Sequence, residues 1–189
     1  MKILLVSEGK HEESGALESL VRRIATKTQT CTWDRVSSDQ IHIHRGKGQG
    51  FVKRAIRWIL EARRRGYDAL VLVIDEDGRP ERLRELAQAQ SEQMLTGSFP
   101  RALGVAIREF DAWILADEKA LSDVLDCTVQ TQPSPEENRD PKADCSILLG
   151  ARMSQRDFYA KVSQTLDLAR LEKRCPKGFG IFASRLRSL

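Results

Sequence analysis

The segment Ala69–Ile74 is the feature that most constrains the fold, because all of its residues are apolar. Continuous apolar runs are typical of parallel strands that helices cover on both faces. The runs Lys2–Ser7 and Ala102–Ile107 have a similar character and predict two further buried strands. We therefore expect a sheet of mostly parallel strands at the centre of the protein.

Helical patterns separate these strands along the chain. Leu17, Leu20, Val21 and Ile24 are spaced to share one face of a helix that starts near Glu12. Further helices are predicted at about 51–65, 80–94, 110–121, 143–153, 155–174 and 180–189, and a brief strand at 41–44. Strands that alternate with helices imply right-handed crossovers and an α/β fold.

The expected architecture has two parts. Residues 1–125 should form a three-layer, Rossmann-like α/β domain around a mostly parallel sheet. Residues 126–189 begin with the proline-containing loop Thr128–Pro141 and should continue as a helical C-terminal extension that packs on the same domain.

The overall composition excludes several classes of protein. A hydrophobic fraction of 41% is normal for a globular chain and excludes disorder throughout. No apolar segment approaches the ~20 residues of a membrane-spanning helix, and the first apolar run is too short for a signal peptide. We therefore expect a cytoplasmic protein with no membrane partner. The four cysteines lie far apart in the sequence, which predicts reduced thiols rather than a zinc site or disulfides.

Basic residues are concentrated between Arg45 and Arg65, where eight of them occur with a single acid, Glu61. This distribution is typical of proteins that bind nucleic acid, and also of ordinary solvated helices. The segment Gly46–Gly50 lacks the Walker spacing, but its amides and Lys47 are candidates for gripping a phosphate. The full set of candidate nucleic-acid contacts is Lys10, Arg45, Lys47, Lys53, Arg57 and Lys142.

Acidic residues follow each of the three predicted buried strands. Glu8 follows the first, Asp75 and Asp77 follow the second, and Glu109 and Asp111 follow the third. The carboxyl ends of parallel strands meet at one edge of a sheet, so these carboxylates are expected to converge. Two carboxylates about 4 Å apart repel by roughly 4 kcal/mol at an effective dielectric constant of about 20. Such a cluster needs a cation, or some of its members take up protons.

Oxygen ligands without a nearby Cys or His favour Mg²⁺ or Mn²⁺ over zinc. Asp75 and Asp77 are two residues apart, so in an extended backbone their side chains point the same way and Glu76 points the other way. The alternative is that these acids are ordinary turn and capping residues, because Asp-Gly and Glu-Gly pairs are common in turns.

Two motifs carry a resemblance to the Toprim domain, which is shared by topoisomerases, bacterial primases and the overcoming-lysogenization-defect nucleases. They are Val6-Ser-Glu-Gly-Lys-His-Glu12 after the first strand and Val73-Ile-Asp-Glu-Asp-Gly78 after the strongest one. By this resemblance, which covers residues 1–117, Glu8, Asp75 and Asp77 would be the catalytic residues and would hold the divalent metal. Glu109 or Asp111 would add a carboxylate to the metal site, as in the nuclease branch.

Over nearly its whole length, the chain also resembles a family of small bacterial Toprim-like proteins. Some members of that family are encoded beside ATPases in what look like defence loci. The additional motifs are Arg108-Glu-Phe-Asp-Ala-Trp-Ile-Leu-Ala-Asp117, Asp140-Pro-Lys142 and Arg174-Cys-Pro-Lys-Gly-Phe179. Position 111 often holds Glu in that family, so the shorter Asp111 has less reach toward a metal.

These features favour a Mg²⁺- or Mn²⁺-dependent nuclease or other phosphodiester-cleaving enzyme, with DNA favoured over RNA and a partner ATPase in antiphage defence. The alternative is a non-catalytic regulatory subunit that binds nucleic acid or an ATPase through the same scaffold. His11, close to Glu8 in the sequence, is a candidate for proton transfer, whereas His42 and His44 are expected to be solvated or hydrogen-bonded. Trp113 is expected in the core and Asp117 at the surface.

Overall fold

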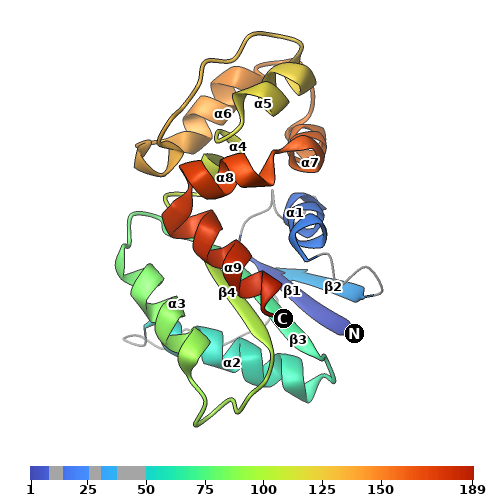
Figure 1. The fold of residues 1–189 in the computed structure, drawn as a ribbon, viewed down its shortest axis with the longest axis vertical. Coiled ribbons are helices and arrows are strands. Elements are labelled where there is room, and N and C mark those ends of the chain that lie inside the picture. The colour runs from blue at the N-terminus through green and yellow to red at the C-terminus, as the bar shows by residue number, and fades with distance from the viewer. Residues whose placement is uncertain (9–14, 26–30, 38–49) are drawn as a thin grey trace.

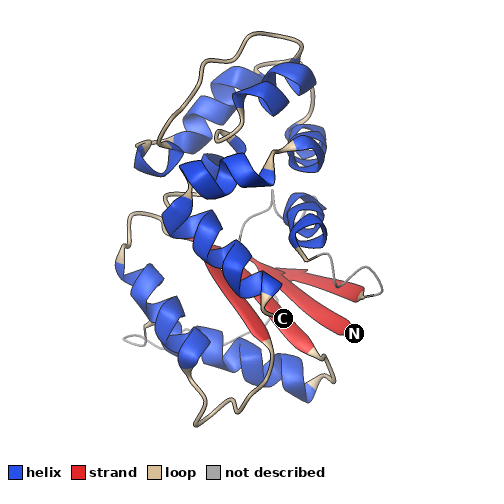
Figure 2. Ribbon diagram, in the orientation of Figure 1, coloured by secondary structure: helices blue, strands red, loops and turns tan. Residues whose placement is uncertain are grey.

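A computed structural model of the 189-residue chain describes residues 1–8, 15–25, 31–37 and 50–189. The described strands form a parallel sheet in the order β2-β1-β3-β4 (Figure 2). They are β1 (Lys2–Ser7), β2 (Thr32–Ser37), β3 (Ala69–Asp75) and β4 (Arg101–Ala106). The two central strands are covered on both faces, which explains why their sequences are almost entirely apolar. The predicted α/β fold with a parallel sheet is confirmed.

The edge strand β2 was not predicted from the sequence. It pairs with β1 along its whole length. Thr32, Asp34 and Arg35 are exposed and Trp33 is half-buried, whereas every residue of the other edge strand, β4, is buried. Because the residues of β2 are mostly polar, β2 contains no apolar run from which a strand could be predicted. The brief strand predicted at 41–44 lies outside the described residues.

Helices α2 (Phe51–Arg64) and α3 (Glu81–Ser91) cover one face of the sheet (Figure 1). The buried side of α2, which includes Ile59, packs in a core with Leu70 and Leu72 of β3. The intervening residues Val71 and Val73 belong to the core of the opposite face. The alternation of side chains along each strand therefore divides the sheet between two helical layers.

The opposite face is covered by α1 (Leu17–Ile24) and α9 (Ile181–Arg187) (Figure 1). Helix α9 packs on β4 at Gly104, where a Cβ would lie 2.6 Å from a ring carbon of Phe182. Trp113 is fully buried, as predicted, with ring centroids 5.2 Å from Phe179 and 5.8 Å from Phe182. This core therefore joins the sheet to helices from both parts of the sequence.

The helical part that follows β4 extends beyond the sheet, toward the top of Figure 1. A short 3-10 helix lies at Pro135–Glu137 in the proline-containing loop, and a π-helical turn at Pro176–Gly180 leads into α9. The α-helices of this part are α4 (Asp111–Ile114), α5 (Glu118–Leu125), α6 (Pro141–Leu149), α7 (Gln155–Thr165) and α8 (Leu168–Arg174).

Two predicted helices are each divided in the structure. The helix predicted at 110–121 breaks before Asp117, whose carboxylate accepts two backbone amides at the start of α5. The helix predicted at 155–174 breaks before Asp167, which caps α8 in the same way. Because apolar residues continue on both sides of each break, only the capping aspartates mark where the second helix begins. Asp117 is 3% exposed, so the prediction that it is a surface residue is wrong.

Candidate functional site

The carboxyl ends of β1, β3 and β4 lie at one edge of the sheet, as parallel pairing requires. The pairing continues past β3 and β4, because the amides of Glu76 and Asp77 donate to the carbonyl oxygens of Ala106 and Arg108. The segments that follow these two strands therefore run side by side. Glu8 directly follows β1 and brings a third chain segment to the same edge.

Arg82 connects the acidic residues of this edge. Its Nη1 lies 3.2 Å from Glu8 Oε2 and 2.8 Å from Asp77 Oδ2, and it also donates to the main-chain oxygen of Asp75. The side chain is almost fully buried, and its guanidinium lies 5.3 Å from the ring centroid of Phe51 at the start of α2. The predicted convergence of Glu8 with Asp77 is therefore observed, and a guanidinium joins the two carboxylates.

Glu8 is held in an environment that favours its protonated form. Burial raises the pKa of Glu8 above its ordinary value of 4.5, and the nearby carboxylate of Asp77 adds to the rise. Arg82 is the strongest opposing influence, and a hydrogen bond from the Asp75 amide also lowers the pKa. A carboxyl group with a raised pKa is suited to transfer a proton, so Glu8 is a candidate general acid or base.

Asp75 and Asp77 have different positions because the chain turns between them. Strand β3 ends at Asp75, and Asp77 has a φ of 50°, in the left-handed region, before Gly78 at 67°. The prediction that both side chains point the same way from extended backbone is therefore wrong. Asp75 Oδ1 accepts the amide of Phe110 at 2.8 Å, whereas Asp77 contacts Arg82. Asp75 thus fixes the segment after β4, and Asp77 is the exposed carboxylate of the turn.

Glu109 lies on the segment that follows β4. The preceding residue, Arg108, has a φ of 65°, and its amide donates to Glu76 Oε2 at 3.1 Å. Burial raises the pKa of Glu109, and the carboxylate of Asp111 adds to the rise, whereas Lys142 opposes it. Glu109 Oε2 is buried and has no hydrogen-bond partner among the described residues. This oxygen is therefore an unused acceptor at the sheet edge.

A pocket of about 410 Å³ opens at this edge, and its lining carries charges of both signs. The lining residues are Asp77, Gly78, Arg108, Glu109, Arg139, Asp140 and Pro141. The carboxylates of Asp77 and Asp140 lie near enough to Glu109 to raise its pKa further. Arginine side chains are common ligands of phosphate oxygens and carboxylates of divalent cations, and the lining holds groups of both kinds. We refer to this cavity as the edge pocket.

Two carboxylates of the edge pocket could contribute ligands to a divalent cation. Within the part of the chain that the structure describes, no three His, Cys, Asp or Glu side chains are grouped closely enough to hold a metal by themselves. Magnesium commonly binds through one or two carboxylates, with phosphate oxygens and waters as its other ligands. Asp77 and Glu109 line the same cavity, and Glu109 Oε2 has no other partner among the described residues. These two side chains are the best placed to hold such an ion.

Asp111 has a different environment from the other predicted ligands. It is 3% exposed, and its Oδ1 accepts the hydroxyl of Tyr159 on α7. The thiol of Cys145 on α6 contacts the Asp111 carbonyl oxygen at 3.8 Å. These contacts anchor α6 and α7 on α4. We therefore leave Asp111 out of the candidate ligands that line the edge pocket.

The predicted nucleic-acid contacts are only partly covered by the structure. Lys53 and Arg57 are exposed on α2, and Lys142 is exposed in the first turn of α6, near Glu109. Three of the predicted contacts and all three histidines lie outside the described ranges: Lys10, Arg45, Lys47, His11, His42 and His44.

The start of α2 is occupied by a carboxylate from the neighbouring helix. The amide of Phe51 donates to Glu85 Oε2 at 3.0 Å. A Cβ on Gly50 would meet Glu85 Oε1 at 2.2 Å, so a larger residue here would displace the end of the Glu85 side chain. The interpretation of the glycine-rich segment as a phosphate cradle therefore does not extend to the first amide of the helix.

Sequence reasoning missed the arginines of the site, namely Arg82, Arg108 and Arg139. Arg82 had a usable signal, because side chains in the first turn of a helix point back toward the preceding loop, which here holds Asp77. Arg139 lies in the proline-containing loop, and the sequence gives no indication that this loop returns to the edge of the sheet.

These features define a class of protein. It is a three-layer α/β protein with a carboxylate- and arginine-lined pocket at the carboxyl edge of a parallel sheet, where open α/β sheets bind their ligands. The chain belongs to the DUF4276 family, which is described as a domain of unknown function and matches residues 7–187. Comparisons with the curated proteins and with the solved structures found no significant match. Across the described ranges, no helix is long and apolar enough to span a bilayer.

Proposed function

We propose that this protein binds nucleic acid at the edge pocket and cleaves a phosphodiester bond with the help of Mg²⁺ or Mn²⁺. The observation that carries the proposal is the composition of the edge pocket. Asp77 and Glu109 line it together with Arg108 and Arg139, and one buried oxygen of Glu109 has no hydrogen-bond partner among the described residues. The resemblance to Toprim nucleases is part of this proposal, because it assigns the same strand ends to the metal.

Each residue of the edge has a separate task in this reaction. Asp77 and Glu109 hold the divalent ion, which would stabilise phosphate charge and lower the pKa of a bound water. Arg108 and Arg139 contact the phosphate oxygens. Glu8, whose pKa burial raises, moves a proton, and Arg82 keeps Glu8 beside Asp77. Asp75 positions Glu109 through the amide of Phe110.

The substrate is a nucleic acid, with DNA favoured over RNA. Lys53 and Arg57 are exposed on α2, the helix whose first residue contacts Arg82, so they can extend the phosphate contacts away from the edge pocket. A partner ATPase, antiphage defence and a cytoplasmic location belong to the same proposal.

The test compares Asp77→Asn with Asp126→Asn. Both positions have a left-handed φ, near 50°, and both side chains are exposed, so the two changes disturb the backbone alike. We expect Asp77→Asn to reduce Mg²⁺- or Mn²⁺-dependent nicking of plasmid DNA, or cleavage of RNA, by about a hundredfold or more. Asp126→Asn should leave cleavage unchanged. Cleavage that is equal in Asp77→Asn and the wild type would contradict the proposal.

A second candidate function is a non-catalytic subunit that binds nucleic acid or an ATPase. It is favoured by Arg82, which already offsets the charges of Glu8 and Asp77. This candidate requires salt-sensitive binding that persists in Asp77→Asn, with no cleavage by the wild type in either metal and with or without an ATPase. Calorimetric titration of Mg²⁺ and Mn²⁺ into the wild type and Glu109→Gln separates the two candidates, because the non-catalytic protein has no use for the ion.

A further inference from the structure

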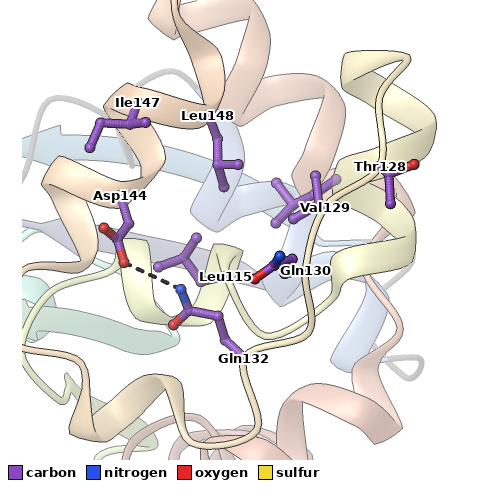
Figure 3. A pocket seen from close by; sticks show the side chains of 9 residues that line it. Leu115, Thr128, Val129, Gln130, Gln132, Asp144, Ile147 and Leu148 are labelled. Atoms are coloured by element: carbon purple, nitrogen blue, oxygen red, sulfur yellow. Dashed lines mark hydrogen bonds between the residues drawn. The ribbon is translucent and has the colours of Figure 1, made fainter.

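A second pocket of about 290 Å³ lies in the helical part that follows β4 (Figure 3). Its lining combines apolar side chains with amide and carboxylate groups: Leu115, Leu121, Thr128, Val129, Gln130, Gln132, Asp144, Ile147 and Leu148. Leu115, Leu121 and Val129 are buried, so the interior is apolar, whereas Gln130 and Ile147 are exposed at the rim. The volume is at the lower end of ligand pockets, which suits one ring system better than a drug-sized molecule.

The polar groups of this pocket are held in place by a network of side chains. Gln132 Nε2 donates to Asp144 Oδ2 at 3.2 Å. Asn138 Nδ2 donates to the same oxygen at 2.8 Å and to Gln132 Oε1 at 3.1 Å. Figure 3 shows the Gln132 side chain directed at Asp144 beside Leu115. The rim therefore presents a fixed carboxylate and amides, the groups that read the edges of nucleobases.

The same network and the same helix connect this pocket to the edge pocket. Asn138 Oδ1 accepts the amide of Asp140, which lines the edge pocket. Pro141 also lines the edge pocket, and Asp144, in the same first turn of α6, lines the second pocket. Three residues of helix advance by about 4.5 Å, so the two pockets have neighbouring walls at the start of α6.

We propose that the second pocket binds one unstacked nucleobase of the nucleic acid whose phosphate occupies the edge pocket. This inference rests on the proposed function and deepens it. Leu115, Val129 and Leu148 contact the ring, and Gln130 and Asp144 bond its edge. A base can enter only when it leaves the stack, so the protein acts on single-stranded segments or on bases flipped from a duplex. The pocket thereby sets which nucleotide lies next to the bond that is cleaved.

The experiment measures the binding of deoxynucleoside 5′-monophosphates and of deoxyribose 5-phosphate to the full chain, by calorimetry with and without Mg²⁺. The two kinds of probe share the sugar and the phosphate and differ only in the base. We expect at least one of the four nucleotides to bind roughly fivefold to a hundredfold more tightly than the sugar phosphate. We expect Ile147→Trp, which places a large ring at the rim, to abolish this preference.

Gln130→Ala should weaken nucleotide binding by about two- to tenfold, because it removes one hydrogen-bonding amide. It should leave binding of the sugar phosphate unchanged. The matched controls are Gln164→Ala on α7 and Met94→Trp, where the native side chains are exposed and lie outside both pockets. Both controls should bind like the wild type.

Two results would overturn the inference. One is equal or undetectable binding of the nucleotides and the sugar phosphate by the wild type. The other is a preference for nucleotides that Ile147→Trp leaves intact while its thermal melting matches that of the wild type. Either result leaves the proposed cleavage untouched, because plasmid nicking in wild type and Asp77→Asn is measured separately. Conversely, a base preference in a protein that cleaves no nucleic acid would contradict the proposed function alone.

Discussion

The acidic side chains of the sheet edge and those at the start of α5 are neutralised in different ways. In the helical part that follows β4, Asp117 accepts two amides at the start of α5, the amide of Asp167 and the guanidinium of Arg170. Glu118 beside it is paired with Arg174 and Arg170. At the sheet edge, Glu109 Oε2 and Arg82 Nε are buried without hydrogen-bond partners among the described residues.

Asp117 and Glu118 stabilise the fold through their partners, whereas an oxygen of Glu109 has no partner among the described residues. Buried polar groups are normally paired, so the unpaired Glu109 Oε2 in the edge pocket is open to a ligand, as the proposed function requires. Asp117 and Glu118, in contrast, are fully paired: Asp117 caps α5, and both bind arginines of α8. The three predictions below test this contrast, beginning with the largest expected effect on stability.

Arg82→Ala should lower the free energy of unfolding by about 2–4 kcal/mol, because it removes a buried guanidinium that pairs with the partly buried Glu8 and the exposed Asp77 and also donates to the main-chain oxygen of Asp75. Added Mg²⁺ should then raise the thermal midpoint more in this variant than in the wild type, since the two carboxylates become available to the ion. Urea unfolding and thermal melting with and without Mg²⁺ measure both effects. Arg79→Ala, an exposed arginine before the same helix, is the control, and an equal loss in both variants would contradict the assignment.

Tyr159→Phe should cost about 1–3 kcal/mol, because Asp111 loses the hydroxyl that it accepts while it stays buried. Nicking activity, measured where the variant is folded, should match that of the wild type if Asp111 only ties α4 to α7. A specific loss of metal binding in folded Tyr159→Phe would restore Asp111 to the metal site that the sequence predicted.

Glu118→Gln should cost about 1–2 kcal/mol at pH 7, an amount reduced by the partial exposure of the pair. The hydrogen bond from Arg174 is the main cause that lowers the pKa of Glu118, from 4.5 to about 2. Because the folded-state pKa is depressed, the stabilisation is present above about pH 4.5 and is lost as the pH falls toward 2. Urea unfolding at pH 7, 5 and 3 should therefore show the wild type and the variant converging in acid.

Glu137→Gln, an exposed acid in the proline-containing loop, is the control for this series. It should follow the wild type at every pH. A difference between wild type and Glu118→Gln that stays constant from pH 7 to pH 3 would show that the carboxylate charge is not what ties α5 to α8.

The central strands could be predicted from the sequence because strands that are buried on both faces consist of uninterrupted apolar residues, as in Ala69–Ile74. The sequence did not predict β2, whose residues are half in solvent and therefore mixed in polarity. Helix breaks at Asp117 and Asp167 were also missed, because apolar spacing continues across them while the capping side chains alone mark the change.

The candidate site shows the same limit. Strand ends could be aligned from topology, so Glu8, Asp77 and Glu109 were found. The direction of the Asp77 side chain depends on a left-handed turn, and the Asp111 environment depends on Tyr159, which is distant in sequence. Neither the direction of Asp77 nor the environment of Asp111 can be predicted from the spacing of nearby residues. Arg139 and the second pocket depend on how the proline-containing loop folds back, which no periodic pattern encodes.

The packing of α9 on β4 has a consequence for how this protein can be divided. Gly104 and Phe182 fit together across the boundary between the predicted domain 1–125 and the extension. A fragment that ends at residue 125 would expose that face of β4 to water, so it would not be a folding unit on its own. Recombination or truncation at this boundary would separate two halves of one core, and this is consistent with a family match that runs across it without a break.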